Sequence, residues 1–251
     1  MVKVGPGRAR LATKATTRLT RVKFGARVVL AQTPVLYKVA VLDNWLQVGR
    51  RSHVMVHRGT ELVIDGFQGS ANSYSIAALR RAQDRHIEVA HHLHCPRQVV
   101  AATRRGIPVL VLLREPRGAV LSLVSRWPEL SLGQGLRDYV RYYSHVLSCA
   151  EALVVGHFPE VTADFGAVMA RVNQRYGTNF PVPAARDHGG EDPLYDAGAD
   201  DRRQRRAVVS ARADELNRPE MAALLARAEA TYAAMLAVAA QDIGTTAGLR
   251  S

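Results

Sequence analysis

Residues 107–113 read Ile-Pro-Val-Leu-Val-Leu-Leu, a continuous run of apolar and mostly branched side chains. Such a run is typical of an interior strand of a parallel sheet, because both faces of that strand are buried. Shorter apolar runs predict further strands, and helical spacing or helix-boundary residues predict helices between them. The expected strands are 61–65, 87–92, 107–113 and 152–157, and the expected helices are 74–85, 96–105, 116–126, 132–149, 163–176, 202–216 and 219–240. Alternating strands and helices predict an α/β fold with a parallel sheet and right-handed crossovers.

The size and composition of the chain fit one domain of this class. The chain has 251 residues, of which 47% are hydrophobic and 22% are charged, and these values exclude disordered, collagen-like and low-complexity proteins. Two cysteines, Cys95 and Cys149, are too few for a disulfide scaffold and fit a reducing compartment. The spacing of Cys and His matches no zinc finger, so we expect no structural zinc site.

The net charge of +12 is concentrated near the N-terminus. Residues 1–58 hold twelve Lys and Arg and a single acidic residue, Asp43. We therefore divide the chain into a basic N-terminal extension at 1–58, a tail followed by helices, and an α/β domain at 59–251. This charge predicts an anionic partner, either a membrane surface, a nucleic acid or an acidic substrate, with a solvated tail as the alternative. The sequence contains no motif that reads nucleic acid.

No segment of the sequence is predicted to cross a membrane. The best apolar run, 28–42, is interrupted by polar residues and proline, and it is shorter than the ~20 residues required. The stretch 221–240 contains two charged residues and predicts an amphipathic helix of a soluble protein. The first twenty residues lack the apolar segment of a secretory signal. Residues 1–42 are free of acids and also fit an organellar transit peptide, although we favour a basic tail.

The first candidate site follows the strand expected at 61–65. Its loop consists of Gly66, Phe67, Gln68, Gly69, Ser70, Ala71, Asn72 and Ser73. A loop of small residues between a buried strand and a helix exposes backbone N–H groups where the helix dipole adds positive potential, which predicts a phosphate site. The Gly-Lys-Ser/Thr ending of a Walker A motif is absent. A sharp strand-to-helix turn needs glycine for its geometry alone, so a purely structural role stays open.

The second candidate site follows the strand at 107–113. Arg114 stands at the carboxyl end of that strand, where ligands of open α/β sheets bind. Ser122 lies eight residues later, inside the helix that begins at Pro116. A guanidinium and a hydroxyl so placed are suited to grip one phosphate from two sides. An Arg–Glu pair at a helix start with a core-facing serine is the structural alternative.

In this order the two sites resemble those of the PAPS-dependent sulfotransferases, above all bacterial members whose first loop reads Gly-Phe-Pro-Arg-Ser-Ala-Asn-Thr. The resemblance runs from about residue 61 to 176 and implies a single-domain, P-loop-like α/β fold. It implies that residues 66–73 bind the 5′-phosphosulfate of 3′-phosphoadenosine 5′-phosphosulfate (PAPS), and that Arg114 and Ser122 bind its 3′-phosphate. It further implies that His94, within the sequence HLHCP, is the catalytic base. Residues 158–164 (FPEVTAD) resemble the stretch after the fourth strand.

The sequence departs from this family at Gly69, where Lys or Arg is usual, and at Gln68, which replaces proline. A cation at that place would stabilise the charge that grows on the bridging oxygen as its bond to sulfur breaks. Three alternatives follow. Another cation takes its place, with His92 as first candidate and Arg58 as second; the enzyme is slow and relies on backbone N–H groups; or the protein binds the nucleotide without transferring sulfate.

Histidines and arginines outside these motifs complete the set of candidates. His86, His91, His92 and His94 crowd nine residues, which raises the question of a metal site. On a strand His92 and His94 share one face and His91 faces the other way, so we expect no metal. Arg202 and Arg205 share one face of the helix expected at 202–216, which the resemblance places over the nucleotide. A solvated basic face is the alternative for this helix.

These observations predict a sulfotransferase that moves a sulfuryl group from PAPS to a hydroxyl of a small-molecule, glycan or lipid acceptor. The alternative is a non-catalytic nucleotide-binding or interaction protein of the same fold, which Gly69 favours. We expect a cytoplasmic protein that needs no metal. If the basic extension binds anionic lipid, the protein associates peripherally with the inner face of a membrane. A homodimer is left open.

Overall fold

The computed structural model describes residue 22, residues 55–184 and residues 199–247. The basic N-terminal extension expected at 1–58 lies outside these residues, except for Val22 and residues 55–58. Most of the segment between the helices expected at 163–176 and 202–216 lies outside them as well. The α/β domain expected from residue 59 onward is otherwise described.

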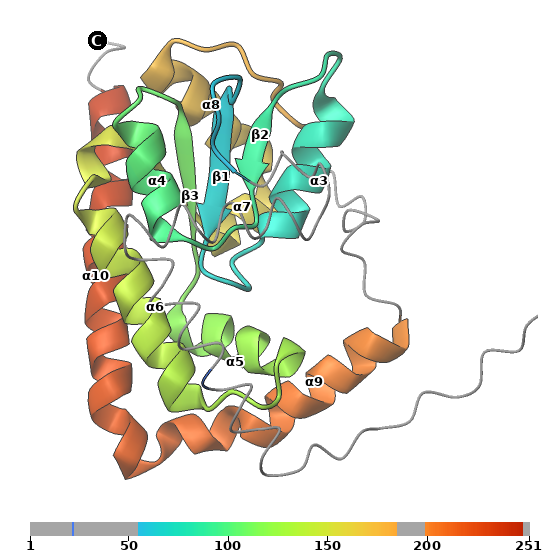
Figure 1. Ribbon diagram of the computed structural model, residues 1–251, viewed down its shortest axis with the longest axis vertical. Coiled ribbons are helices and arrows are strands. Elements are labelled where there is room, and N and C mark those ends of the chain that lie inside the picture. Colours follow the sequence, from blue (N-terminus) through green and yellow to red (C-terminus); the bar gives the residue numbers. More distant parts are fainter. Residues whose placement is uncertain (1–21, 23–54, 185–198, 248–251) are drawn as a thin grey trace, which may run out of the picture.

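Four parallel strands form one sheet that is flanked by helices, as the sequence predicts (Figure 1). The strands are β1 (Leu62–Gly66), β2 (Val89–His91), β3 (Val109–Leu113) and β4 (Val154–His157), in the spatial order β2-β1-β3-β4. The helices are α3 (Asn72–Ala82), α4 (Pro96–Thr103), α5 (Pro116–Arg126), α6 (Leu132–Leu147), α7 (Phe158–Ala163), α8 (Phe165–Tyr176), α9 (Ala199–Ala213) and α10 (Pro219–Ala247), with 3-10 turns η2 (Ala150–Ala152) and η3 (Asp214–Asn217).

The strands are apolar throughout because helices cover both faces of the sheet. Val109, Val111 and Leu113 of β3 belong to a core cluster formed with α4, α5, α6 and α10. Leu110 and Leu112, which alternate with them, belong to a second cluster formed with α3, α7 and α8. Side chains of a strand point alternately to its two faces, so a continuous apolar run fits a strand that is buried on both. Figure 1 shows the corresponding two layers of helices on either side of the sheet.

The strand order places a switch point between β1 and β3. The chain leaves β1 toward β2 on one side and later enters β3 on the other side. The register aligns Gly66 with Leu112 and Leu113 with His157, so these three strands end close to one level. Ligands of open α/β sheets bind outside the carboxyl ends of the strands at such a switch point. The loop after β1 and the residues after β3 are therefore placed where a ligand is expected.

Several element bounds differ from the sequence prediction for identifiable reasons. The helix predicted at 163–176 is wrong at its start, because two helices occupy 158–176 and Asp164 separates them. The Asp164 side chain accepts a hydrogen bond from Ala167 N at 3.0 Å and so caps α8. The strand predicted at 87–92 is shortened to three residues and ends at His91. The helix predicted at 202–216 begins at Ala199 and changes to a 3-10 turn after Ala213.

Helix α10 contains the stretch 219–240, whose length and mean hydropathy of 1.3 would allow it to cross a membrane. It packs against α6 and β4. Its buried apolar residues are Leu225, Ala228, Met235 and Ala239. Their spacings of three, seven and four residues place them on one face of the helix. Burial on a single face agrees with the amphipathic helix that the sequence predicts here.

Candidate functional site

The loop after β1 has the geometry of a tight strand-to-helix turn. A side chain at Gly66 would lie 2.4 Å from Leu112 O, so the close approach of β1 and β3 requires glycine there. Gly69 and Ala71 have positive φ angles of 84° and 71°, and Ser70 N donates to Phe67 O. Ala71 precedes α3, and its side chain makes no capping hydrogen bond. The first N–H groups of α3 therefore point out of an uncapped helix start, which favours an anion.

Gly69 lies directly against α5, the helix that carries Ser122. A Cβ atom built on Gly69 would lie 2.7 Å from Ser122 Cβ and 2.8 Å from Ser122 Oγ. Arg114 Nη1 donates to Gly69 O at 3.0 Å. The structure thus brings together the two motifs that the sequence analysis paired, although more than forty residues separate them. It also shows that a lysine or arginine at position 69 would collide with Ser122 and strain the backbone.

Arg114 is held in a partly buried position at the end of β3. Its guanidinium carbon lies 4.2 Å from the centre of the Phe158 ring, at the start of α7. Its Nε lies 3.7 Å from Glu115 Oε1 and makes no hydrogen bond within the described residues. Burial lowers the pKa of Arg114, and the neighbouring Glu115 opposes that shift. A buried guanidinium N–H without an acceptor suits a position where a ligand oxygen supplies one.

Arg126, at the end of α5, is a candidate that the sequence analysis missed. Its Nη1 donates to Ser122 Oγ at 3.0 Å, and Ser122 in turn touches Gly69. Ser122 and Arg126 are four residues apart and so share a face of α5. Helical spacing from Ser122 was the available signal in the sequence. The charge on Arg126 is also among the causes that lower the pKa of His92, which places it near the histidine segment.

Asp65 is fully buried and ties the loop to the segment that carries His94. Its Oδ1 accepts hydrogen bonds from Gly66 N at 2.9 Å and from His94 N at 3.2 Å, and its Oδ2 accepts from Gln98 Nε2 at 3.3 Å. Burial raises the pKa of Asp65 to about 7, and these hydrogen bonds partly oppose the shift. One carboxyl group therefore connects the end of β1, the third residue after β2 and helix α4.

His94 is oriented by the carbonyl of Gly66. His94 Nδ1 lies 2.7 Å from Gly66 O, and a carbonyl accepts, so Nδ1 carries the hydrogen. In the neutral ring the lone pair is then on Nε2, the atom that would accept a proton from a substrate. Its backbone φ of 52° is unusual for a histidine, and strain of this kind is often found at functional sites.

The prediction that His92 and His94 share one face of a strand, with His91 on the other face, is wrong. β2 ends at His91, and His92 has a φ of 60°, so the alternation of a strand does not continue through residues 92–94. His91 and His92 contact each other instead, with their Nδ1 atoms 2.7 Å apart. His92 Nε2 lies 3.1 Å from Ser73 Oγ. The described residues contain no group of three or more His, Cys, Asp or Glu side chains suited to a metal ion.

Neither His92 nor Arg58 replaces the Lys or Arg that the sulfotransferases have where this chain has Gly69. Burial and neighbouring positive groups lower the pKa of His92 to about 2, so its ring is neutral at physiological pH. Arg58 precedes β1, at the opposite end of a five-residue strand from Gly66. Arg126, on α5, is the cation that the structure brings to the side chain touching Gly69.

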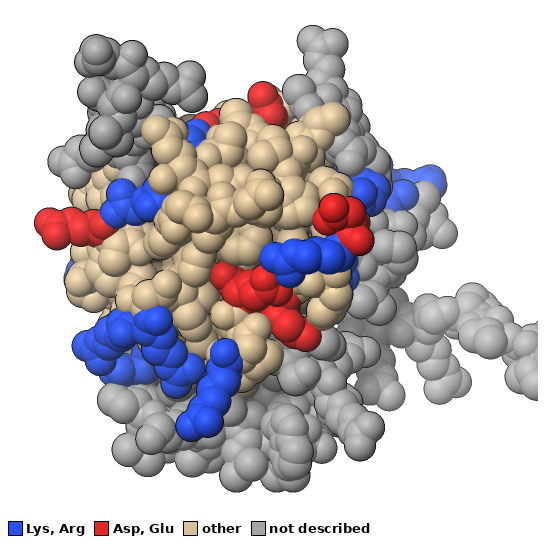
Figure 2. Space-filling view, turned by 90° about the horizontal axis from the view of Figure 1, so that it is seen from above, with Lys and Arg blue, Asp and Glu red and all other residues tan. Residues whose placement is uncertain are grey.

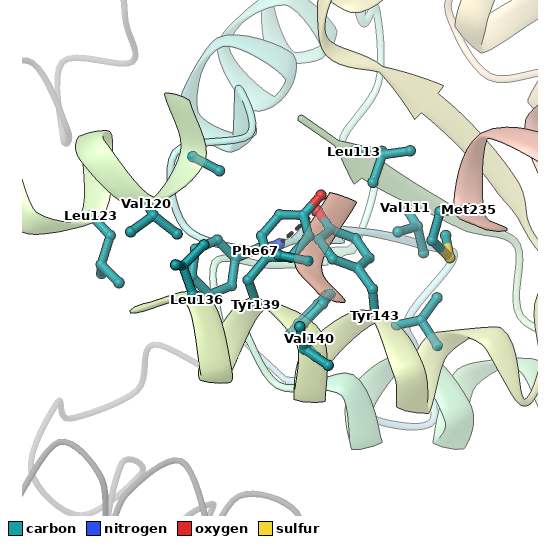
Figure 3. Packing of buried hydrophobic residues seen from close by; sticks show 14 of the residues in the cluster. Phe67, Val111, Leu113, Val120, Leu123, Leu136, Tyr139, Val140, Tyr143 and Met235 are labelled. Atoms are coloured by element: carbon teal, nitrogen blue, oxygen red, sulfur yellow. Dashed lines mark hydrogen bonds between the residues drawn. The ribbon is translucent and has the colours of Figure 1, made fainter. Parts of the chain in front are cut away.

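Two tyrosines of α6 contact both motifs, and Figure 3 shows Tyr139 and Tyr143 beside Phe67 of the loop. Tyr143 OH donates to Leu112 O at 2.7 Å, accepts from Phe67 N at 3.4 Å and lies 3.4 Å from Ser70 Oγ. Tyr139 OH donates to Arg114 O at 2.7 Å. One turn of α6 therefore fixes the loop after β1 and the residue after β3. The sequence analysis missed this role, because tyrosines four residues apart in an amphipathic helix also fit an ordinary core.

Arg202 and Arg205 lie on α9, which packs against α5. Arg205 forms an ion pair with Asp201 of the same helix. The helix is thus next to the one that carries Ser122 and Arg126, while a direct role of its arginines in ligand binding stays a prediction.

Comparisons of the chain with family models, with curated proteins and with solved structures found no match. The function proposed below therefore depends on the residues at this edge of the sheet.

Proposed function

We propose that the protein is a PAPS-dependent sulfotransferase with a P-loop-like arrangement of β1, its loop and α3. One observation carries the proposal. The loop after β1 contacts both Arg114 and Ser122 through Gly69, at the switch point of the sheet. A nucleotide with phosphates at both its 5′ and 3′ positions needs two anion sites at short range, and this edge offers two.

The roles of the binding residues follow from their positions. The backbone N–H groups of residues 66–73 and of the first turn of α3 bind the 5′-phosphosulfate. Arg114 and Ser122 bind the 3′-phosphate, and the buried Arg114 Nε supplies a hydrogen bond that the described residues leave open. Arg202 and Arg205 of α9 close over the nucleotide from the side of α5.

The chemistry proposed for the site is transfer of a sulfuryl group to a hydroxyl. His94 Nε2 takes the proton of the acceptor hydroxyl as its oxygen forms a bond to sulfur. The bond between sulfur and the bridging oxygen breaks, and its electron pair stays on that oxygen, which leaves as part of 3′,5′-ADP. Arg126 stabilises the charge that grows there, because Gly69 provides no side chain for the purpose.

Calorimetry with 3′,5′-ADP and 5′-AMP tests this assignment. We expect 3′,5′-ADP to bind more tightly, because 5′-AMP lacks the 3′-phosphate. Arg114→Ala should weaken 3′,5′-ADP by about 2–3 kcal/mol, or roughly 30- to 150-fold, and 5′-AMP much less. Arg105→Ala, an exposed arginine beyond the end of α4, serves as the control for loss of charge. Equal losses for the two nucleotides would show that Arg114 supports the fold and binds no 3′-phosphate.

A non-catalytic nucleotide-binding protein is the second candidate, and the glycine at position 69 favours it. A side chain at this position would collide with Ser122, so position 69 has no room for the usual cation. Release of 3′,5′-ADP from PAPS in the presence of hydroxyl acceptors separates the two candidates. Tight nucleotide binding with no release for any acceptor class, whether small molecule, glycan or lipid, would favour the second.

We also propose that the basic segment at 1–58 holds the protein at an anionic membrane surface. The twelve Lys and Arg of this segment provide the attraction, which salt screens. Sedimentation with vesicles that contain phosphatidylserine measures this binding. It should weaken at high salt and when residues 1–17 are removed. Binding that does not respond to salt, or no binding, would contradict it.

A further inference from the structure

Four side chains from α3 and the end of β2 form an unbroken chain of hydrogen bonds beside the loop. Arg80 Nη2 lies 3.4 Å from His91 Nε2. His91 Nδ1 lies 2.7 Å from His92 Nδ1, and His92 Nε2 lies 3.1 Å from Ser73 Oγ. This series of hydrogen bonds starts near the end of α3, passes through two imidazole rings and returns to the second residue of the same helix. Ser73 is therefore connected to a guanidinium through two rings.

The chemistry of the first member fixes the direction of every hydrogen bond. A guanidinium only donates, so His91 Nε2 accepts and carries the lone pair. Neutral His91 then holds its hydrogen on Nδ1 and donates it to His92 Nδ1. His92 in turn has its hydrogen on Nε2 and donates it to Ser73 Oγ. Burial and neighbouring charges lower the pKa of His92 to about 2, which agrees with a neutral ring in this chain.

A consequence follows for the Ser73 hydroxyl, which is the last acceptor of the chain. Because Ser73 Oγ accepts from His92, its own hydrogen points away from the histidine. Ser73 is the second residue of α3, among the uncapped N–H groups at the helix start. Arg80 is the donor that keeps the lone pair of His91 on Nε2; if His91 instead held its hydrogen on Nε2, His92 Nε2 would accept the hydrogen of Ser73. The hydroxyl would point toward the ring and would be lost as a donor to the loop.

We propose that Arg80, His91 and His92 are positioning residues that make the Ser73 hydroxyl a hydrogen-bond donor to an oxyanion at the start of α3. The proposal rests on the proposed function, because it assumes that an oxyanion binds in this loop. It assigns a role to His92 that needs neither a positive charge nor a proton transfer. The left-handed backbone of His92 turns its ring onto His91 and Ser73, which a continued strand would prevent.

Ring nitrogen NMR of the protein without ligand tests the direction of the chain. We expect His91 in the tautomer with hydrogen on Nδ1 and His92 in the tautomer with hydrogen on Nε2, with signals assigned through His91→Gln and His92→Gln. Arg80→Met should convert His91 to a mixture of tautomers. Arg80→Lys, which still donates, should keep the wild-type pattern. Arg81→Met removes the same charge from the next residue of α3 and is the matched control. A wild-type His91 with its hydrogen on Nε2 would overturn the proposal.

A double-mutant cycle tests the consequence for binding, with inorganic pyrophosphate and 3′,5′-ADP as probes. Ser73→Ala should weaken both ligands about tenfold, as expected for one hydrogen bond to a charged group. Arg80→Met should weaken them by a smaller factor, about twofold for an even mixture of tautomers, and the double variant should lose no more than Ser73→Ala alone. Arg81→Met should bind as the wild type does. Additive losses would show that Arg80 acts independently of Ser73 and would overturn the proposal.

The two probes separate failure of this inference from failure of the proposed function. Binding of pyrophosphate without binding of 3′,5′-ADP would reject the nucleotide function, while a non-additive cycle would still support the positioning role. Binding of both ligands with additive losses would reject the positioning role alone. A wild type that binds neither ligand would reject both proposals.

Discussion

The two ends of the sheet use the same kinds of residue in different ways. At the amino end, Gly106 has a φ of 68° and no atom would lie within 4 Å of an added Cβ. At the carboxyl end, Gly69 has a φ of 84° and an added Cβ would collide with Ser122. Position 106 thus favours glycine only because of its positive φ. Position 69 favours glycine for its φ and also because the loop packs closely against α5 there. At Gly106 the positive φ therefore stands alone, whereas at Gly69 it coincides with a close contact between two elements.

Charges and polar groups show the same contrast. Figure 2 views the molecule from above, toward the end where the strands begin, and shows acidic and basic side chains side by side on the described surface. Arg85 and Glu61 pair there at 2.8 Å while both stay partly exposed. At the carboxyl end Asp65, Ser70, Asn72 and His91 are buried, and the non-glycine residues of the described part with positive φ are Ala71, His92 and His94. Strain and buried polarity are thus concentrated where the proposed ligand binds.

The largest effect should come from His94, whose removal tests whether the carboxyl end performs chemistry. If His94 is the base, His94→Ala should lower turnover by roughly 10²–10⁴ and leave the affinity for 3′,5′-ADP nearly unchanged. His94→Asn can keep the hydrogen bond to Gly66 O without the basicity and should be no more active than alanine. Full turnover in both variants would make His94 a structural histidine.

The comparison of the two glycines predicts the next largest effect. Gly106→Ala should lower the free energy of unfolding by about 1–2 kcal/mol, for the left-handed angle alone. Gly69→Ala should lose a similar amount and about 1–3 kcal/mol more, because its methyl group overlaps Ser122. Urea unfolding of both variants measures the difference. Equal losses would mean that α5 moves away from the loop without cost. Gly69→Arg should likewise disrupt the loop and not restore a cation to it.

Asp65 provides an effect that depends on pH. Burial raises its pKa to about 7 in the folded protein, well above the value of an unfolded chain. The folded state therefore holds a proton that the unfolded state releases, so stability falls as the pH rises from about 4 to 7, by up to about 1.4 kcal/mol per pH unit. Asp65→Asn cannot ionise and should lack this slope. Parallel stability–pH curves for the two proteins would show that Asp65 is ionised throughout.

The smallest effect should come from the amino end. Arg85→Gln removes one partner of the Glu61 pair, in which both side chains are exposed to solvent. Water and salt screen such pairs, so we expect the midpoint of urea unfolding and the affinity for 3′,5′-ADP to be unchanged. A clear loss of stability would mean that the surface pair supports the strand ends, and the contrast between the two ends would then be weaker than we infer.

The sequence predicted the strands well because apolar runs bounded by polar residues are a local signal. All four strands lie within the predicted ranges or extend one residue beyond them, as β1 does at Gly66. The resemblance assigned the Gly66–Ser73 loop and the Arg114–Ser122 pair to one nucleotide, and in the structure Gly69 contacts both Arg114 and Ser122. Their binding roles stay predictions.

The rest of the site depends on geometry that a sequence does not carry. The left-handed backbone at His92 and His94 is adopted by residues that rarely take it, so alternation along a strand gave the wrong faces. Arg126 and the two tyrosines of α6 gain their roles from contacts between elements, such as Tyr143 with Phe67 across 76 positions of the chain. Their spacing in the sequence is the same as that of ordinary surface and core residues.

The hydroxyl of Tyr143 has a consequence for the order in which the protein is assembled. It joins the carbonyl of Leu112 to the amide of Phe67, so it completes the loop after β1 from a helix much later in the chain. During synthesis the loop leaves the ribosome well before this tyrosine exists, and a nascent chain that ends before α6 holds β1, β2 and β3 without it. The hydrogen bonds that Tyr143 makes to the loop and to β3 can thus form only after α6 has been translated and has packed against the sheet.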